Sequence, residues 1–421
     1  MNRPLGRSEA LLARARRVIP LATQTLSKST SQWLQGVAPV YLERGAGSHV
    51  WDVDGNEWVD FPMALGPVLL GYAEPAVDEA IRRQLADGIT FTLCHPLEVE
   101  VAERIVALCP GVEAVRFAKS GSDAVTAAVR AARAATGRDH VVVCGYHGWH
   151  DWYIGSTTRD RGVPAAVQAL TSAVAFGDLA ALGEALDRHP VAAVIVEPAG
   201  ATTPPDGYLQ GLVDLAAAEG AVSVFDEVIT GFRLAPGGAR ERYRVIPDLS
   251  CYGKALGNGM PISAVAGRWS VMAEFEEVFF SGTHGGETLS LAAARTVLDI
   301  IADGTVLAGI RARGERMLKG IESLIETYGV ADAVGVGGEP ERAVVVVRGP
   351  EPELLRSWLQ QCVLDEGCLF NGSMFICARH SDADVDRALA GLERAFAGLA
   401  DGTVVSERLR GPMLRPVFRA P

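Results

Sequence analysis

The sequence predicts an α/β fold, with a large domain built on a mainly parallel sheet covered by helices on both faces, and a smaller α+β domain. Short apolar and β-branched runs, which suit buried parallel strands, alternate with segments of helical spacing that are about ten to fifteen residues long. The clearest strands are expected at residues 141–143, 191–196 and 221–225. From about Gly309 the pattern changes to a long helix, a strand at 343–347 and a final helix at 382–397, which indicates the smaller domain. No element is predicted for the tail from Gly402.

The domains are expected to follow the order of the chain. At 421 residues, the chain is long enough for one large and one smaller domain. Residues 1–60 should form an N-terminal segment that packs with the small domain, residues 61–308 the large domain, and residues 309–421 the C-terminal small domain. Within residues 41–60 the polarity alternates around Asp54-Gly55, which predicts a β-hairpin with a two-residue turn.

Composition argues against several classes of protein. The formal net charge is −12, with both signs spread along the chain, and this argues against nucleic acid and anionic membrane as partners. No apolar run reaches the roughly 18–20 residues that are needed to span a bilayer. The seven cysteines contain no C-x-x-C pair and do not describe a disulfide framework, which favours a reducing cytoplasm. The arginine-rich stretch at 8–18 is expected to be a first helix of the fold rather than a targeting peptide.

An acid and a lysine stand at two neighbouring strand ends. The strand at 221–225 runs into Asp226, at the sheet edge where open α/β folds bind ligands. A second short segment, 248–252, leads into Gly253 and Lys254, and further glycines frame this turn. Such a pair suits pyridoxal 5′-phosphate (PLP), because the lysine can form the Schiff base while the carboxylate holds the pyridinium proton. Taken alone, most pairs of this kind are structural.

The residues around the pair form a distinctive sequence. Residues 226–233 read DEVITGFR, Pro247-Asp248 follows, and residues 253–261 read GKALGNGMP. This sequence resembles the signature of class III PLP-dependent aminotransferases. Within the class it is most similar to the branch of glutamate-1-semialdehyde 2,1-aminomutase and its relatives that act on sugars and other polar carbonyl compounds. The resemblance extends over about residues 8–397 and implies fold type I, a large PLP-binding domain, and Lys254 and Asp226 as catalytic residues.

A second kind of chemistry, anion binding, is indicated between residues 115 and 137. A β-like run reaches Ser120-Gly121-Ser122, and a helix ending at Gly137 follows. Free backbone N–H groups at the helix start and the Ser122 hydroxyl can hold a phosphate. The alternative, that Ser122 is an ordinary N-cap, would be favoured in isolation. The resemblance implies that Gly121 and Ser122 bind the cofactor phosphate, although the family usually has threonine and glutamate where this chain has Ser122 and Asp123.

Aromatic and imidazole side chains follow the strand at 141–143. His147, His150 and Asp151 invite a metal site, but their spacing matches no zinc motif, and no metal is expected. The resemblance implies instead that Tyr146 stacks on one face of the cofactor, with His147 and Gly148 at its edge.

Three further positions complete the site that the resemblance implies. Glu197 should lie on the substrate side of the cofactor, although an exposed strand-end acid is the alternative. Val228 should pack on the ring face opposite Tyr146. Thr283 matches a family threonine that reaches across a dimer interface to the partner's cofactor phosphate, so the resemblance implies a homodimer with two shared active sites. An ordinary loop before the helix at 288–301 is the alternative for Thr283.

The substrate is indicated less clearly. Where the aminomutase has a PGGVNSPVR-like entrance, residues 20–29 here read PLATQTLSKS. We therefore expect a ping-pong aminotransferase that moves an amino group from a small amino donor to a polar aldehyde or ketone, such as a sugar or aminocyclitol-type biosynthetic intermediate, with Lys254 as general base. Glutamate-1-semialdehyde 2,1-aminomutase or a PLP-dependent epimerase remains the alternative. A cofactor-free paralogue that only scaffolds a partner is a remote one. Residues 27–30 are either a substrate-contact loop or a solvated loop.

Overall fold

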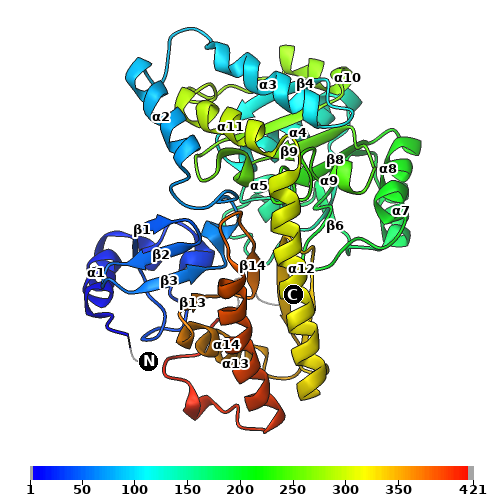
Figure 1. Ribbon diagram of the computed structural model, residues 1–421. Coiled ribbons are helices and arrows are strands. Elements are labelled where there is room, and N and C mark those ends of the chain that lie inside the picture. Colours follow the sequence, from blue (N-terminus) through cyan, green and yellow to red (C-terminus); the bar gives the residue numbers. More distant parts are fainter. Residues whose placement is uncertain (1–2, 416–421) are drawn as a thin grey trace. The chain divides into compact units, whose positions relative to one another are not determined.

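The computed structural model describes residues 3–415, which form two compact units (Figure 1). The larger unit contains residues 66–69 and 75–308, and the smaller unit contains residues 3–65, 70–74 and 309–415. The predicted domain borders after residues 60 and 308 stay predictions. Within the described chain, no helix is both long enough and apolar enough to cross a membrane.

A seven-stranded sheet forms the centre of the larger unit. Its strands are, in spatial order, β4 (Ala114–Ala118), β10 (Ser263–Gly267), β9 (Leu249–Tyr252), β8 (Val222–Glu227), β7 (Val191–Val196), β5 (His140–Cys144) and β6 (Thr171–Ala173). From β9 to β6 all neighbours pair in parallel, whereas β10 is antiparallel to both β9 and β4. The predicted mainly parallel sheet is therefore confirmed.

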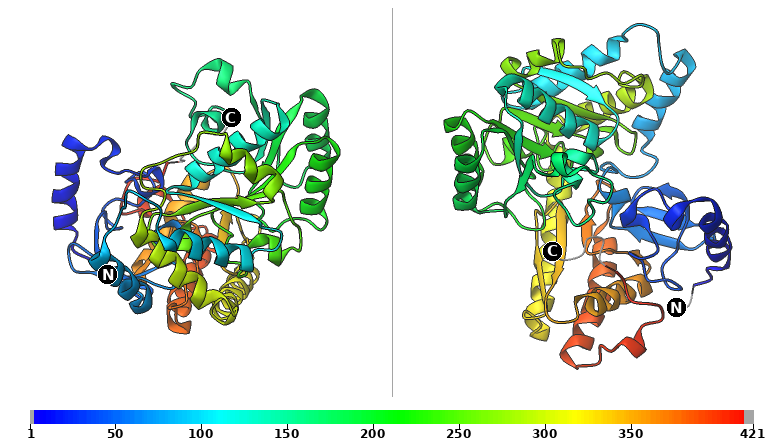
Figure 2. Two further views of the ribbon diagram at one scale, coloured as in Figure 1. Left: turned by 90° about the horizontal axis from the view of Figure 1, so that it is seen from above. Right: turned by 180° about the vertical axis from the view of Figure 1, so that it is seen from behind.

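Helices cover both faces of this sheet. Helix α4 (Gly121–Thr136) packs on one face, where it meets Val141. Helices α7 (Leu179–Arg188) and α8 (Tyr208–Ala218), green in Figure 2, pack on the other face, where they meet Val142. Because successive side chains of a strand point to opposite faces, a continuous run of valines in β5 serves both layers.

The larger unit contains further helices outside these two layers. Helix α11 packs against α2 and α3. The full set of further helices is α2 (Pro75–Asp87), α3 (Pro96–Leu108), α5 (Asp151–Ile154), α6 (Ala165–Gln168), α9 (Ala239–Arg242), α10 (Trp269–Met272), α11 (Thr288–Ile301) and the 3₁₀ helices η4 (Lys254–Gly257) and η5 (Ala273–Glu276).

The smaller unit has two small sheets and long helices, as an α+β arrangement requires. One sheet has the order β1 (Leu42–Ala46), β2 (His49–Asp52), β3 (Glu57–Asp60) and β13 (Cys368–Leu369), and the other has the order β11 (Val334–Gly337), β12 (Arg342–Val347) and β14 (Ser373–Phe375). The helices are α1 (Gly6–Val18), α12 (Thr305–Tyr328), α13 (Pro352–Asp365), α14 (Asp382–Ala400) and the 3₁₀ helices η1 (Pro20–Ala22), η2 (Leu26–Lys28), η3 (Met63–Leu65) and η6 (Ser406–Arg408). The long predicted helix thus begins at Thr305, before Gly309.

The hairpin between β2 and β3 differs from the prediction in its turn. Residues 53–56 form a four-residue loop instead of a two-residue turn. The Asp52 Oδ1 atom accepts hydrogen bonds from the N–H groups of Asp54 and Asn56, at 3.0 and 2.8 Å, and the Asn56 side-chain amide donates to Oδ2. These bonds provide partners for the backbone N–H groups of the wider loop, because an Asp side chain can replace main-chain acceptors in a turn.

The same loop also caps the first helix. Leu5 precedes α1 and offers no capping side chain. The Asp54 carboxylate instead accepts from the N–H groups of Arg7 and Ser8, at 2.7 and 2.9 Å. A carboxylate at this end of a helix satisfies free N–H groups and opposes the positive end of the dipole.

His380 makes the stability of the smaller unit depend on pH. The ring is buried and stacks on Phe61, and its Nδ1 accepts from the N–H of Cys377 at 2.9 Å. Burial lowers the pKa of His380 from 6.5 to about 4. Unfolding therefore takes up a proton between these two values, so that stability falls as the pH falls from 6.5 towards 4.

We predict that the unfolding free energy falls further in the wild type than in a His380→Asn variant when the pH is lowered from 7 to 4.5. The difference between the two falls should be about 2 to 3 kcal/mol. Asparagine keeps an acceptor for Cys377 but does not titrate. Guanidinium unfolding at both pH values, followed for the smaller unit, measures the difference. His284→Asn is the control, since His284 is exposed; equal pH dependence of wild type and His380→Asn would contradict the prediction.

Candidate active site

Two adjacent carboxylates end strand β8 and turn to opposite sides. Glu227 is fully buried and accepts from the N–H groups of Ala239 and Arg240 at the start of α9. Burial raises the pKa of Glu227 to about 7, against the opposing effect of Arg240. Asp226 points the other way, as the alternation of a strand requires. The sequence placed Asp226 after the strand, whereas β8 continues through Glu227.

Asp226 is held by a histidine from the neighbouring loop. Its Oδ2 lies 2.8 Å from Nδ1 of His147, and its Oδ1 accepts from the N–H of Val228 at 3.2 Å. Because Oδ2 can only accept when the carboxylate is ionised, Nδ1 of His147 is the donor. The ring is buried, and its Nε2 has no hydrogen-bond partner within the described chain. Asp226 is itself 6% exposed. The pair therefore presents an oriented carboxylate at the sheet edge.

Tyr146 and Glu197 lie beside this pair. The N–H of Tyr146 donates to Glu197 Oε2 at 2.8 Å, and a Cβ on Gly145 would lie only 2.6 Å from the same oxygen. The pKa of Tyr146 is raised by burial and then by the charges of Asp226 and Glu197. The Tyr146 side chain is nonetheless 50% exposed. An aromatic ring next to the carboxylates is thus partly exposed to solvent.

The start of α4 has the form of an anion site. Ser120 is the N-cap, and it forms a capping box with Asp123, whose N–H donates to Ser120 Oγ at 3.2 Å. The alternative that Ser122 is an ordinary N-cap is therefore wrong, since Ser122 is the second residue of the helix. The cap leaves the first two N–H groups of α4, those of Gly121 and Ser122, available to a ligand.

Close packing joins this turn to the other predicted residues. A Cβ on Gly121 would lie 2.8 Å from Val228 Cγ1, and one on Gly253 would lie 3.4 Å from the same atom. A Cβ on Gly148 would overlap the Ser122 hydroxyl oxygen. The helix start, Val228 two residues after Asp226, and the residue before the lysine therefore converge on one small region.

Lys254 comes just after the next strand, β9. In the register of β8 and β9, Asp226 lies opposite Cys251, three residues before Lys254. Lys254 begins the 3₁₀ turn η4 with φ of +37°. A non-glycine residue with positive φ is strained, and such strain is concentrated at functional sites. Thr283, in contrast, lies exposed in the loop between η5 and α11, and its role stays a prediction.

One group beside the site was not foreseen from the sequence as part of it. The Thr126 hydroxyl, on α4, lies 2.7 Å from His150 Nδ1 and accepts from Trp152 Nε1 at 2.8 Å. His150 Nε2 is 3.8 Å from Asp123 Oδ1. The segment after Gly148 is thereby tied to the first turns of α4. The sequence shows only that both residues can form hydrogen bonds. No pattern in it indicates that position 126 contacts position 150.

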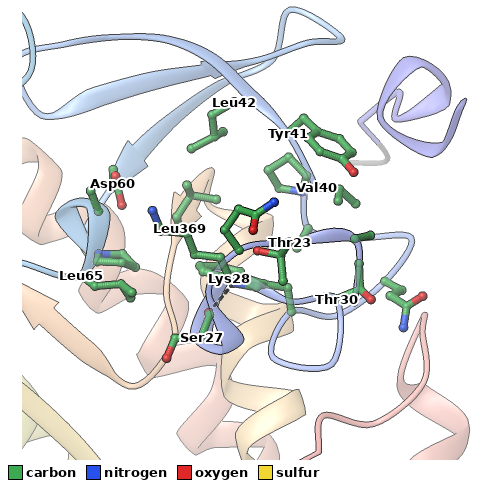
Figure 3. Close-up of a pocket in the computed structure, with 18 of the residues that line it drawn as sticks. Thr23, Ser27, Lys28, Thr30, Val40, Tyr41, Leu42, Asp60, Leu65 and Leu369 are labelled. Atoms are coloured by element: carbon green, nitrogen blue, oxygen red, sulfur yellow. Dashed lines mark hydrogen bonds between the residues drawn. The ribbon is translucent and has the colours of Figure 1, made fainter. Parts of the chain in front are cut away.

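The smaller unit has a cavity of its own, about 530 Å³ in volume (Figure 3). Its polar wall includes Ser27, Lys28 and Asp60. Asp60 Oδ2 accepts from the Tyr72 hydroxyl at 2.5 Å, and burial raises the pKa of Asp60 while that hydrogen bond and the Lys28 charge oppose the rise. The polar loop at 27–30 thus lines a cavity, and its contact with substrate stays a prediction.

The residues at the edge of the larger sheet fit PLP. The free N–H groups and hydroxyl at the start of α4 suit a phosphate, and a buried, oriented carboxylate suits a protonated ring nitrogen. A partly exposed aromatic ring and a strained lysine complete the set of groups that the cofactor requires.

Comparison with known proteins gives a consistent result. Residues 32–339 match the family model of class III aminotransferases. Glutamate-1-semialdehyde 2,1-aminomutases from Methanothrix thermoacetophila and Chloroflexus aurantiacus are 35% and 36% identical to the chain, and each alignment covers 94% of this chain and 97% of the relative.

Solved structures agree. The FumI protein of Sphingopyxis sp. MTA144, solved in a form with PLP, superposes with a TM-score of 0.88 at 28% identity and covers 95% of this chain and 98% of its own. An omega-transaminase from Sphaerobacter thermophilus gives 0.85 at 26% identity, with 94% and 98% covered. The chain is therefore a PLP-dependent enzyme that belongs to the class III aminotransferases, as its sequence motifs indicated.

Proposed function

We propose that this enzyme moves an amino group on a small polar oxo compound, and that the 2,1-amino shift of glutamate-1-semialdehyde is the first reaction to test. This choice rests on one observation: the relatives that match at 35% and 36% identity over nearly the whole chain are both named glutamate-1-semialdehyde 2,1-aminomutase. The sequence alone favoured transfer from an external donor, with the aminomutase as the alternative. The curated relatives support that alternative better.

In the proposed reaction, each side chain at the sheet edge has a defined role. When bound, PLP supplies a charged pyridine ring that withdraws electrons from the carbon bearing the amino group. Asp226 holds the proton of the ring nitrogen, and His147 fixes the carboxylate by donating from Nδ1. Lys254 binds the cofactor through Nζ and, once released, moves a proton as the general base.

The remaining residues hold and shape the cofactor. Gly121 and Ser122 bind its phosphate with N–H groups and a hydroxyl, at the positive end of α4. Gly148 packs against Ser122 and leaves no space for a side chain there. Tyr146 stacks on one ring face and Val228 packs on the other. These two residues restrain the ring so that its reactive side faces the substrate.

Glu197 completes the proposed site. It accepts from the N–H of Tyr146, which fixes the carboxylate beside the stacking residue. We assign it to the substrate side of the cofactor, where a carboxylate can orient an incoming amine.

Transfer between two separate molecules is the second candidate. Residues 20–29, PLATQTLSKS, replace the entrance sequence of the aminomutase, and Ser27 and Lys28 line the cavity of the smaller unit. The solved omega-transaminase and other transaminases also superpose well on this chain. These observations support an amino donor and a polar aldehyde or ketone acceptor, such as a sugar or aminocyclitol-type intermediate.

We further propose a homodimer with shared active sites. Several large apolar side chains of the larger unit are exposed: Ile89, Phe91, Leu93, Val99, Trp149, Trp269 and Phe279. A second copy of the chain would cover such side chains, and Thr283 would reach the phosphate held by that copy. The seven cysteines form no disulfide within the described residues, and six of them are buried. This supports a reducing compartment, and we propose a cytoplasmic biosynthetic enzyme.

Replacing Asp226 by asparagine should slow proton transfer about 10- to 100-fold with a modest loss of PLP, because a hydrogen bond to a charged group contributes about 1.5–3 kcal/mol. Single-turnover mixing with an amino compound, followed by cofactor absorbance, measures the rate. His147→Asn keeps a donor to the carboxylate and should lose less. Asp178→Asn, in the N-cap of α7, is the control. Full activity of Asp226→Asn would show that another residue faces the ring nitrogen.

The two candidate reactions separate when the donor is supplied alone. In a transferase, glutamate or alanine should convert all of the bound PLP to its aminated form and release one equivalent of oxo acid. In an aminomutase, these donors should fail, whereas ¹⁵N-labelled substrate should be isomerised with its label retained. Lys254→Ala is the control and should neither turn over nor form a borohydride-trapped adduct. Absence of both reactions in the wild type would contradict the proposed function.

Shared active sites predict complementation between two inactive variants. A mixed dimer of Lys254→Ala and Thr283→Ala subunits contains one site in which both residues are intact. Random mixing should restore about a quarter of wild-type activity, since about half of the dimers are mixed and each has one normal site. Activity assays before and after subunit exchange test this. A fully active monomer in sedimentation would refute the shared site.

A further inference from the structure

Two adjacent buried glutamines of α13 hold two different parts of the chain. The first, Gln360, is 1% exposed. Its Oε1 accepts from the N–H of Leu34 at 2.6 Å, and its Nε2 donates to the carbonyl oxygens of Gln32 and Phe370, at 3.2 and 2.9 Å. A buried amide needs such partners. Gln360 therefore fixes the end of the loop of residues 23–35, which we call the N-terminal loop.

The second glutamine fixes the chain that follows α14, residues 402–415, which we call the C-terminal tail. Gln361 is 5% exposed, accepts from the N–H of Arg410 at 2.8 Å and donates to the Arg408 carbonyl at 3.1 Å. Ser357, one turn earlier on α13, accepts from the N–H of Leu414 at 3.0 Å. Hydrogen bonds at both ends of residues 408–414 thus attach the tail to α13.

The C-terminal tail also contacts the N-terminal loop directly. The N–H of Arg415 donates to the Ser31 carbonyl at 2.9 Å, and the Gln32 side chain donates back to the Arg415 carbonyl. A Cβ on Gly411 would overlap the Gln35 carbonyl oxygen, so the two backbones touch there. The tail therefore lies against the loop as well as against the helix.

The N-terminal loop in turn lines the cavity of the smaller unit. Thr23, Ser27, Lys28 and Thr30 belong to its wall (Figure 3), and Trp33 donates from Nε1 to the Ser27 carbonyl at 3.3 Å. Apart from the single 3₁₀ turn η2, the loop has no regular structure. A segment of this kind takes its order from contacts with other elements.

We propose that the C-terminal tail is a clamp that holds the N-terminal loop in the shape the cavity needs to bind its ligand, with Gln360 and Gln361 as positioning residues. That the ligand is the oxo substrate rests on the proposed function. The clamp itself rests on the contacts of α13, the loop and the tail.

Amide hydrogen exchange of the PLP-loaded enzyme tests the clamp. Deleting the chain after Asp401 and, separately, replacing Gln361 by alanine should each accelerate exchange in residues 31–38 about tenfold or more, since each lost hydrogen bond contributes about 1 kcal/mol. Exchange in β7 should not change. Ser406→Ala is the matched control, because its hydroxyl bonds only to exposed Glu407 within the described chain. Unchanged exchange in residues 31–38 in both variants would overturn the clamp.

Kinetics test the link to the substrate. Gln361→Ala should raise KM for the oxo substrate severalfold and leave kcat within about twofold, because the variant disorders a binding wall and not the reacting groups. Accelerated exchange with an unchanged KM would overturn the assignment of the cavity to the substrate. An enzyme that turns over no oxo compound would contradict the proposed function, whereas the exchange experiment would still decide the clamp.

Discussion

The two carboxylates that end β8 impose the main constraint on the larger unit. A buried carboxylate is tolerated only with partners, and here the strand delivers one to each side. Glu227 is satisfied by the start of α9, which must therefore fold against the sheet. Asp226 is satisfied by His147, which the loop after β5 must bring to the same edge. The start of α9 and the loop after β5 are thus both linked to the sheet through a single dipeptide.

This constraint explains which parts of the site could be read from the sequence. Asp226 and Lys254 stand in short local patterns, and the strands that carry them are continuous apolar runs, so both the sheet and its reactive edge were predictable. The helix start near Ser120 was predictable as a strand-turn-helix junction that could hold an anion, but the sequence could not decide which serine is the cap. That choice depends on Asp123 reaching back to the Ser120 N–H.

Contacts between distant segments account for what the sequence did not reveal. The link between Thr126 and His150 joins two separate elements. The four-residue hairpin loop, in contrast, depends on local hydrogen bonds to the Asp52 side chain. The C-terminal tail shows no helix or strand pattern in its sequence. Its backbone is held instead by hydrogen bonds to the side chains of Gln361 and Ser357 of α13. In the same way, the motifs that identify the family are local, whereas the N-terminal loop is ordered by hydrogen bonds from the distant Gln360.

The capping of α1 by Asp54 has a consequence for how the smaller unit assembles. A helix of 13 residues is marginal on its own in water, and this one receives its cap from a residue more than forty positions later. Its formation is therefore coupled to closure of the β2–β3 loop, and the beginning of the chain cannot reach its final structure during synthesis until the hairpin has emerged.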